Sequence, residues 1–291
     1  MSLTAAAKVN LALEVLGKRP DGYHELATVL QTVDLMDRLV LEDADELALT
    51  TSSADVPADG GNLALRAAVA LREATKVERG VRVHLEKRVP VAAGLGGGSS
   101  DAAAVLLGLN RLWGLRWPLA RLAEVAVTLG MDVPFFLRGG VALGTGRGEQ
   151  LTPLAGMPLA LVLVSPGTPL STAAVYGRVT PAMYSSGAEA RRMAAALRTR
   201  KPGEVAASLY NGLEAAAAGA HPDLTRMRAA LMAAGALGVL MSGSGPTMFG
   251  VARSFEQARQ IRARLVRGSW RCWAVRTLSG PAVRIRGVRG S

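Results

Sequence analysis

The sequence contains one run dominated by glycine and serine, Pro90-Val91-Ala92-Ala93-Gly94-Leu95-Gly96-Gly97-Gly98-Ser99-Ser100. The alternating apolar and polar residues 81–89 before it predict a strand, and Ser99-Ser100-Asp101 after it predict the start of a helix that reaches about Trp113. Four glycines within five residues let backbone amides turn inward at positive φ. A helix start directs the positive end of its dipole at the same place, so the run predicts a phosphate-binding loop.

The two commonest phosphate loops are excluded by the spacing. A Walker A loop requires Gly-Lys-Ser/Thr, which does not follow, and the dinucleotide fingerprint requires a last glycine where Ser99 stands. A merely flexible glycine turn would not need two hydroxyls and an aspartate at the helix start. The run is therefore interpreted as a different phosphate loop.

Composition indicates a globular α/β protein. Of 291 residues, 49% are hydrophobic and 20% charged, which suits two domains of ordinary size with a seam near 152–158. The longest apolar stretch, 154–166, contains Gly156 and Pro158 and is shorter than a membrane span, and no secretory signal is apparent. The single cysteine, Cys272, fits a reducing compartment. These features predict a cytoplasmic protein without membrane contact.

The net charge of +11 is concentrated at the C-terminal end. Ten arginines and one acidic residue, Glu256, lie within 253–291. Residues 253–267 predict an amphipathic helix with a solvated arginine face, and the last ten residues predict a basic tail. We interpret this charge as a solubilising surface, and a nucleic-acid partner is not expected.

Strand and helix patterns alternate along both halves of the chain. Strands are predicted at 8–16 (half-buried), 38–50, 81–89, 141–143, 159–165, 239–242, 247–251 and 271–277. Helices are predicted at 62–77 (capped by Asn62), 99–113, 118–129 (closed by a left-handed Gly130), 188–198, 203–217, 223–234 and 254–266. The pattern predicts an α+β protein divided into domains 1–155 and 156–291.

Three motifs in order resemble the GHMP kinases, the superfamily named for galactokinase, homoserine, mevalonate and phosphomevalonate kinases. The motifs are the glycine-serine run, Ala7-Lys8-Val9-Asn10, and Met241-Ser242-Gly243-Ser244-Gly245-Pro246-Thr247. The resemblance implies the two-domain α+β GHMP kinase fold. In that fold a ribosomal-S5-like N-terminal β/α domain and a ferredoxin-like C-terminal α/β domain enclose the active site.

Three further stretches resemble one branch of this superfamily. They are Lys8-Val9-Asn10-Leu11, Arg19-Pro20-Asp21-Gly22-Tyr23-His24-Glu25-Leu26 and Met131-Asp132-Val133-Pro134-Phe135-Phe136. Members of this branch use ATP and Mg²⁺ to phosphorylate the 2-hydroxyl of 4-diphosphocytidyl-2-C-methylerythritol in the non-mevalonate isoprenoid pathway. The resemblance therefore implies a small-molecule kinase whose substrate carries a cytidine diphosphate.

The resemblance assigns a role to each matching residue. Asp132 is the predicted base for the hydroxyl proton, and Lys8 the predicted cation for the transferring phosphoryl group. Asn10 adds a hydrogen bond, Tyr23 and Tyr176 are predicted to sandwich the cytosine, and His24 to bond its edge. The remaining predicted contacts are Thr172 to the substrate and, to the nucleotide, Asn62, Lys87, Pro90, Gly94, Leu95, Gly96, Gly97, Gly98, Ser99, Ser100, Ser242, Gly243 and Ser244. Either Ser99 or Ser100 is the predicted Mg²⁺ ligand.

Other interpretations remain open at this level. The loop at 144–148 is either a second anion site or, as we favour, a turn near the active site. The chain departs from the pattern at Ala6, where proline is usual, and at Gly212, where aspartate is frequent. A kinase for mevalonate or homoserine, a non-catalytic nucleotide-binding regulator and a basic nucleic-acid module are the alternative functions, and the expected assembly is a monomer or weak homodimer.

Overall fold

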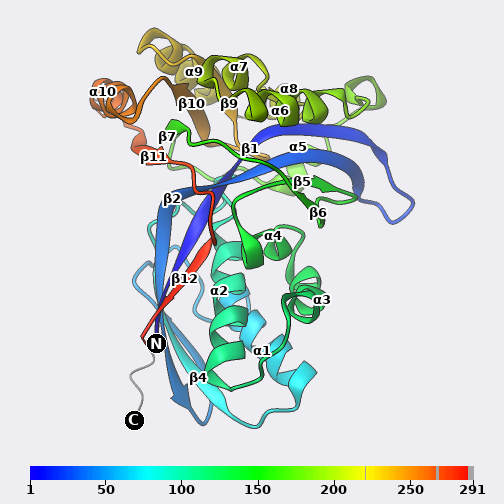
Figure 1. Ribbon diagram of the computed structural model, residues 1–291, viewed down its shortest axis with the longest axis vertical. Coiled ribbons are helices and arrows are strands. Elements are labelled where there is room, and N and C mark those ends of the chain that lie inside the picture. The colour runs from blue at the N-terminus through cyan, green and yellow to red at the C-terminus, as the bar shows by residue number, and fades with distance from the viewer. Residues whose placement is uncertain (220, 267–268, 288–291) are drawn as a thin grey trace.

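Two long antiparallel strands, β1 (Ser2–Lys18) and β2 (His24–Ala44), run through most of the molecule in the computed structural model (Figure 1). The structure describes residues 1–219, 221–266 and 269–287. The larger sheet has the order β12-β1-β2-β4-β3, while β5 and β6 extend from β2 and β8 pairs with β1. The other strands are β3 (Leu47–Thr51), β4 (Gly80–Glu86), β5 (Val141–Thr145), β6 (Gln150–Pro153), β8 (Tyr210–Asn211) and β12 (Val283–Arg286).

Helices cover one face of this sheet (Figure 1). They are α1 (Leu63–Thr75), α2 (Gly97–Leu112), α3 (Leu119–Leu129) and α4 (Val133–Arg138). Apolar residues of the strands, such as Leu41 and Leu85, meet Ala103 and Leu106 of α2 in one fully buried core. Helix α2 is therefore fixed along its length, and its first turn faces the middle of the molecule.

A smaller antiparallel sheet with helices on its outer side forms the second lobe. Its order is β11-β7-β10-β9, with β7 (Ala160–Ser165), β9 (Gly238–Met241), β10 (Met248–Ala252) and β11 (Arg271–Arg276). The helices are α5 (Thr172–Tyr176), α6 (Ala188–Thr199), α7 (Pro202–Ala207), α8 (Glu214–Ala218), α9 (Asp223–Ala233) and α10 (Phe255–Leu265), with a 3-10 turn at Pro181–Met183. Within the described ranges, no helix combines the length and apolarity that a bilayer crossing requires.

The middle of β1 differs from the half-buried strand that the sequence predicted. Residues 5–15 are buried on both faces, including Lys8, Asn10 and Glu14. One face packs on the α2 side, and the other meets α6, whose Ala190 and Met193 join the core around β1. Polar side chains on β1 therefore lie inside the protein.

Other boundaries also differ from prediction. The predicted helix 203–217 is interrupted because Tyr210–Asn211 pair with β1 as β8. Helix α2 begins at Gly97 with Gly96 as its N-cap, so Ser99 and Ser100 lie in its first turn rather than before it. Gly130 is extended rather than left-handed, with φ 167°.

The C-terminal arginines serve as packing groups as well as surface charge. The predicted basic tail is wrong for Val283–Arg286, which form β12 beside β1, and residues 288–291 lie outside the described part of the chain. In α10, Arg262 donates to the Cys272 carbonyl over 3.0 Å, and Arg264 donates to the Ala234 carbonyl over 2.9 Å. The division into domains 1–155 and 156–291 stays a prediction.

Candidate active site

A cavity of about 1080 Å³ lies between the two lobes and receives residues from both glycine-rich loops. Seventeen of the twenty predicted site residues line it: Lys8, Asn10, Tyr23, His24, Asn62, Lys87, Pro90, Gly94, Gly96, Gly97, Gly98, Ser99, Asp132, Thr172, Tyr176, Gly243 and Ser244. The chain therefore brings together residues that are up to 236 positions apart in sequence.

The glycine-serine loop has the backbone geometry of an anion site. Gly94 and Gly96 adopt φ values of 75° and 68°, a region that side chains rarely tolerate. A Cβ on Gly96 would approach the Phe136 ring to 2.8 Å, so a larger residue there would clash with the ring in addition to straining the backbone. The first amides of the 16-residue helix α2 therefore face the cavity with the positive end of the helix dipole behind them.

Three predicted loop residues do not reach the cavity, because they anchor the loop from behind. Leu95 is buried in the core, and its carbonyl accepts from the Lys8 amide over 2.9 Å. The Ser242 hydroxyl donates to the Gly94 carbonyl over 2.9 Å. Ser100 is fully buried, so of the two serines considered as Mg²⁺ ligands it is Ser99 that lines the cavity.

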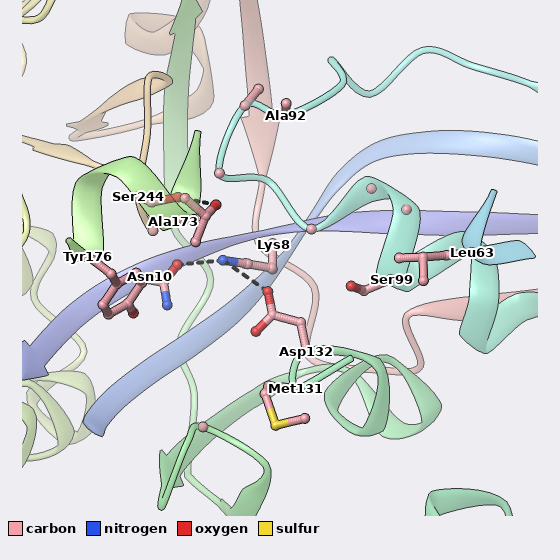
Figure 2. Close-up of a pocket in the computed structure, with 18 of the residues that line it drawn as sticks. Lys8, Asn10, Leu63, Ala92, Ser99, Met131, Asp132, Ala173, Tyr176 and Ser244 are labelled. Carbon is pink, nitrogen blue, oxygen red and sulfur yellow. Dashed lines mark hydrogen bonds and ion pairs between the residues drawn. The ribbon is translucent and has the colours of Figure 1, made fainter. Parts of the chain in front are cut away.

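Lys8 and Asp132 approach each other at the centre of the cavity (Figure 2). The Lys8 ammonium lies 3.4 Å from the Asp132 carboxylate and donates to the Asn10 side-chain oxygen over 2.7 Å. Asn10 in turn donates to the Thr28 hydroxyl over 2.8 Å, which fixes the orientation of its amide group. The Lys8 side chain is 5% exposed and that of Asp132 36% exposed, so the carboxylate is the member of the pair that a ligand reaches.

Asp132 owes its position to a short helix. It is the N-cap of α4, and Pro134 stands in the first turn, where its missing N–H costs nothing. No side-chain capping bond ties the carboxylate to the helix. Ser99 points from the opposite side toward the same space (Figure 2).

The second glycine-rich loop closes over the first. Its Thr247 amide donates to the Ala93 carbonyl over 3.3 Å, and the Ser244 hydroxyl bonds that of Thr172 over 2.8 Å. A Cβ on Gly243 would lie 3.2 Å from the Lys8 ammonium nitrogen. The loop thus contacts the predicted phosphate, catalytic and substrate residues together.

Sequence reasoning missed the residues that hold this second loop. Asn211 donates to the carbonyls of Met241 and Gly243, each over 2.8 Å. Glu214 accepts the Met241 amide over 2.6 Å and is paired with Arg228. The Asn-Gly-Leu-Glu run at 211–214 was the available signal, although the sequence predicted only a helix there.

Aromatic groups collect at the far end of the cavity. The rings of His24 and Tyr176 lie 5.3 Å apart, whereas Tyr23 is 52% exposed and has the Arg147 guanidinium 5.1 Å from its ring centre. Burial lowers the pKa of His24, with Lys18 adding to the effect, so its imidazole is neutral at pH 7. Burial, with a smaller contribution from Asp132, raises the pKa of Tyr176. This end offers flat apolar surfaces with neutral hydrogen-bonding groups.

Residues 144–148 form the end of β5 and most of the turn into the antiparallel strand β6, so the prediction of a turn is confirmed. Its Arg147 nevertheless lines the cavity beside Tyr23. The Arg147 amide donates to the Glu149 carboxylate over 2.7 Å, and the same carboxylate group lies 3.5 Å from the guanidinium. The turn therefore places the Arg147 guanidinium, held by Glu149, at the aromatic end of the cavity.

The opposite end is apolar around the start of α1. Asn62 caps this helix by accepting the Ala64 amide over 2.9 Å, and Val56, Pro57 and Leu63 line the cavity around it. Lys87 also lines the cavity, but its ammonium bonds inward to two buried carboxylates, Asp37 and Asp101. Neither carboxylate was predicted to belong to the site.

The donor set fits magnesium held largely by phosphate and water. Among residues 1–219, 221–266 and 269–287, no group of three histidine, cysteine or acidic side chains is placed to hold a metal. The Ser99 hydroxyl and the Asp132 carboxylate supply hard oxygens on the two sides of the cavity. Mg²⁺ binds in this way in many phosphoryl-transfer sites, with few protein ligands.

Models of two protein domains match the chain. GHMP kinases N terminal domain matches residues 62–140, and GHMP kinases C terminal matches residues 193–271. A crystal structure of homoserine kinase from Cytophaga hutchinsonii is similar, with a TM-score of 0.77 and 20% identity, over 98% of this chain and 96% of that one. The predicted two-domain α+β GHMP kinase fold is confirmed.

Proteins with higher sequence identity to this chain than the homoserine kinase share one name. The 4-diphosphocytidyl-2-C-methyl-D-erythritol kinase of Pelotomaculum thermopropionicum is 46% identical over 94% of this chain and 97% of its own length. That of Symbiobacterium thermophilum is 46% identical over 96% and 100%. A crystal structure of 4-(cytidine 5'-diphospho)-2C-methyl-D-erythritol kinase has a TM-score of 0.82 and 42% identity, over 95% of this chain and 99% of that one. The chain belongs to the GHMP kinases and, within them, to the family of 4-diphosphocytidyl-2-C-methyl-D-erythritol kinases.

Proposed function

We propose that this kinase transfers the γ-phosphoryl group of ATP to the 2-hydroxyl of 4-diphosphocytidyl-2-C-methyl-D-erythritol, giving the 2-phosphate and ADP. The observation that carries the proposal is the Lys8–Asp132 pair, 3.4 Å apart, between a phosphate loop and an aromatic end in one cavity. This arrangement suits a substrate whose hydroxyl lies in the middle and whose base lies at the far end. The reaction belongs to the non-mevalonate route to isoprenoid precursors.

The chemistry follows from the geometry of the pair. As the bond from the 2-oxygen to the γ-phosphorus forms and the bond from that phosphorus to the β–γ bridging oxygen breaks, the hydroxyl proton passes to Asp132. Lys8 holds the carboxylate on one side and neutralises charge on the transferring group. Asn10 keeps the Lys8 ammonium in place through the bond of 2.7 Å.

ATP occupies the phosphate-loop side in this proposal. The amides of Gly96 to Gly98 receive the phosphates, and the apolar surface around Asn62 and Leu63 receives the adenine. Bound Mg²⁺ supplies charge neutralisation on the phosphate oxygens, with Ser99 as its protein ligand. Ser244 and Thr172, joined by a hydrogen bond, link the nucleotide side with the substrate side.

The substrate's cytosine lies between Tyr23 and Tyr176 in this proposal. His24, neutral at pH 7, then donates or accepts at the edge of the base. Its present contact with Tyr176 leaves the ring beside the space that the base would fill. We also expect a cytoplasmic monomer or weak homodimer without a nucleic-acid partner.

An assay that couples ADP formation to NADH oxidation tests the proposal on a panel of alcohols. We expect turnover with 4-diphosphocytidyl-2-C-methyl-D-erythritol, and turnover with mevalonate or homoserine lower by at least about 10³-fold in kcat/KM, because a site built for a polar base loses those contacts with either alcohol. Turnover of mevalonate or homoserine without turnover of the cytidyl substrate would overturn the proposal.

Replacing Tyr176 by leucine should raise KM for the cytidyl substrate about 10- to 100-fold, because stacking of one base on an aromatic ring is worth about 1–3 kcal/mol. KM for ATP should stay within about twofold, and Tyr176→Phe, which keeps the ring, should remain close to the parent. Tyr184→Leu is the matched control, since Tyr184 does not line the cavity. An unchanged KM for the cytidyl substrate in Tyr176→Leu would exclude the stacking role.

A further inference from the structure

Three charged side chains are buried together beside the phosphate loop, where Lys87 and Asp101 also line the cavity. The Lys87 ammonium lies 2.5 Å from the Asp37 carboxylate and 2.9 Å from that of Asp101. The exposed fraction of the side chain is 6% for Lys87, 0% for Asp37 and 3% for Asp101. Asp37 lies on β2, Lys87 directly follows β4, and Asp101 lies in the first turns of α2. We call this group the Lys87 cluster.

Asp37 holds the chain that leads into the loop. The pairing of β2 with β4 ends at Arg38 and Glu86, so the next amides have no partner strand. The Asp37 carboxylate takes over, accepting the Arg88 amide over 2.6 Å and the Val89 amide over 2.9 Å. Its second oxygen accepts from Lys87. One carboxylate therefore fixes the direction in which the chain leaves the sheet.

Asp101 holds the chain that leaves the loop. Through Lys87, its carboxylate connects the start of α2 to Asp37 and hence to β2. The ammonium lies close against the loop backbone, because a Cβ on Gly97 would come within 2.9 Å of it and within 3.0 Å of Val89 Cγ1. Bonds to one ammonium group thus link the two ends of the loop, 87–89 and 97–101.

The energetics indicate that this cluster is more than a stabilising contact. Buried ion pairs contribute little net stability, and apolar residues of similar volume often do as well or better. Here two carboxylates share one ammonium, and the second oxygen of Asp101 has no hydrogen-bond partner among the residues that the structure describes. Burial raises the pKa of Asp101 to about 7, with Lys87 opposing the shift and Asp37 adding to it. Such an arrangement is costly for stability but fixes geometry closely.

The cluster also changes the interpretation of Lys87. The sequence predicted that this lysine contacts the nucleotide, yet burial, which lowers its pKa, is outweighed by the carboxylates of Asp101 and Asp37, and the net pKa is raised. The charge is therefore held by its two inward partners.

We propose that Asp37, Lys87 and Asp101 are positioning residues that hold the two ends of the phosphate loop at the separation required to bind ATP. The inference rests on the proposed function, because it assumes that the loop receives the phosphates of ATP. It assigns Asp37 and Asp101, neither of which belongs to the predicted site, to the affinity for the nucleotide.

Asp101→Ala tests the proposal most directly, because it removes the connection from Lys87 to α2 and leaves Lys87 paired with Asp37. We expect the dissociation constant of ATP in the presence of Mg²⁺, measured by calorimetry, to rise about tenfold, since small displacements of a binding group are costly. KM for the cytidyl substrate should stay within about twofold. Asp101→Asn, which keeps an oxygen for the Lys87 ammonium, should restore ATP binding to within about threefold of the parent.

Asp43→Asn is the matched control. Asp43 also lies on β2 and forms an ion pair with Arg79, beside β4, at 2.8 Å. This pair is exposed and lies at the other end of the strands. Its ATP affinity should equal that of the parent. If Asp101→Ala fails to fold in thermal unfolding, Asp37→Asn carries the same test. Asp37 uses both carboxylate oxygens, so an amide loses either the bond from Lys87 or those from the Arg88 and Val89 amides, and its ATP affinity should fall likewise.

Two results would overturn the positioning role. One is an ATP dissociation constant within twofold of the parent in a folded Asp101→Ala or Asp37→Asn variant. The other is an equal loss in Asp101→Asn and Asp101→Ala, since the retained oxygen would then not matter. Because equilibrium binding of ATP needs no alcohol substrate, a failure of the proposed function would appear separately, in the parent enzyme's turnover.

Discussion

Replacing Asp132 by asparagine is expected to lower kcat by about 10³-fold, because a positioned base contributes about 10²- to 10⁴-fold to a proton transfer. The amide keeps the size and can still face the Lys8 ammonium, 3.4 Å from the carboxylate in the parent, but it cannot accept the hydroxyl proton. KM values for both substrates should change by less than about threefold. Steady-state kinetics with saturating ATP and single-turnover mixing measure the effect.

The control for this prediction is Asp223→Asn. Asp223 also lies at a helix start and forms an ion pair with Arg226 at 2.9 Å, but it does not line the cavity. Its kcat should equal that of the parent. The midpoint of urea unfolding should be little changed in Asp132→Asn, because the side chain is 36% exposed and makes no capping bond. Parental turnover in Asp132→Asn would remove this residue from the mechanism.

Replacing Lys8 by methionine is expected to lower kcat by about 10²- to 10³-fold, the usual effect of deleting one group that stabilises transition-state charge. Methionine fills much of the same space on β1, while the Asn10 oxygen loses its donor at 2.7 Å. Rapid-quench measurement of phosphoryl transfer separates this loss from product release. An exposed lysine, Lys201, which pairs with Glu204 at 2.9 Å, gives the control variant Lys201→Met, with no expected change.

The double variant Lys8→Met/Asp132→Asn sharpens this prediction. If the two side chains act as one unit, the combined loss should be close to the larger single loss rather than their product. Fully multiplicative losses would mean that Lys8 and Asp132 act independently and would contradict the pair as described. Parental kcat in Lys8→Met would exclude the lysine from charge stabilisation.

Local sequence was sufficient for the loops that form the site. The glycines at 94–98 require positive φ and close approach at particular positions, and these requirements leave a readable pattern. Asn62 could likewise be predicted as a cap from its place before an alanine-rich helix, and the structure confirms its bond to the Ala64 amide. The positive φ values and the cap bond depend on neighbours within a few residues.

The missed features depend on distant partners. Asp37 meets Lys87 across 50 positions, and nothing near Asp37 in sequence marks it as the end of a strand pairing. The helix predicted at 203–217 has suitable alanines, but Asn211 is recruited by β1 and by the carbonyls of the second glycine loop. In the same way Val283–Arg286 carry arginines that favour a solvated tail, yet pairing with β1 makes them a strand.

The nuclear magnetic resonance spectrum of the product tests the central claim most directly. In 4-diphosphocytidyl-2-C-methyl-D-erythritol, carbon 2 carries a methyl group and no hydrogen, so a phosphate on its oxygen has no three-bond proton neighbour. We predict one new phosphomonoester ³¹P resonance without proton splitting, formed together with ADP while the two diphosphate resonances of the substrate persist. A phosphomonoester split by carbinol protons, or ADP formation without a new phosphomonoester, would contradict transfer to the 2-hydroxyl.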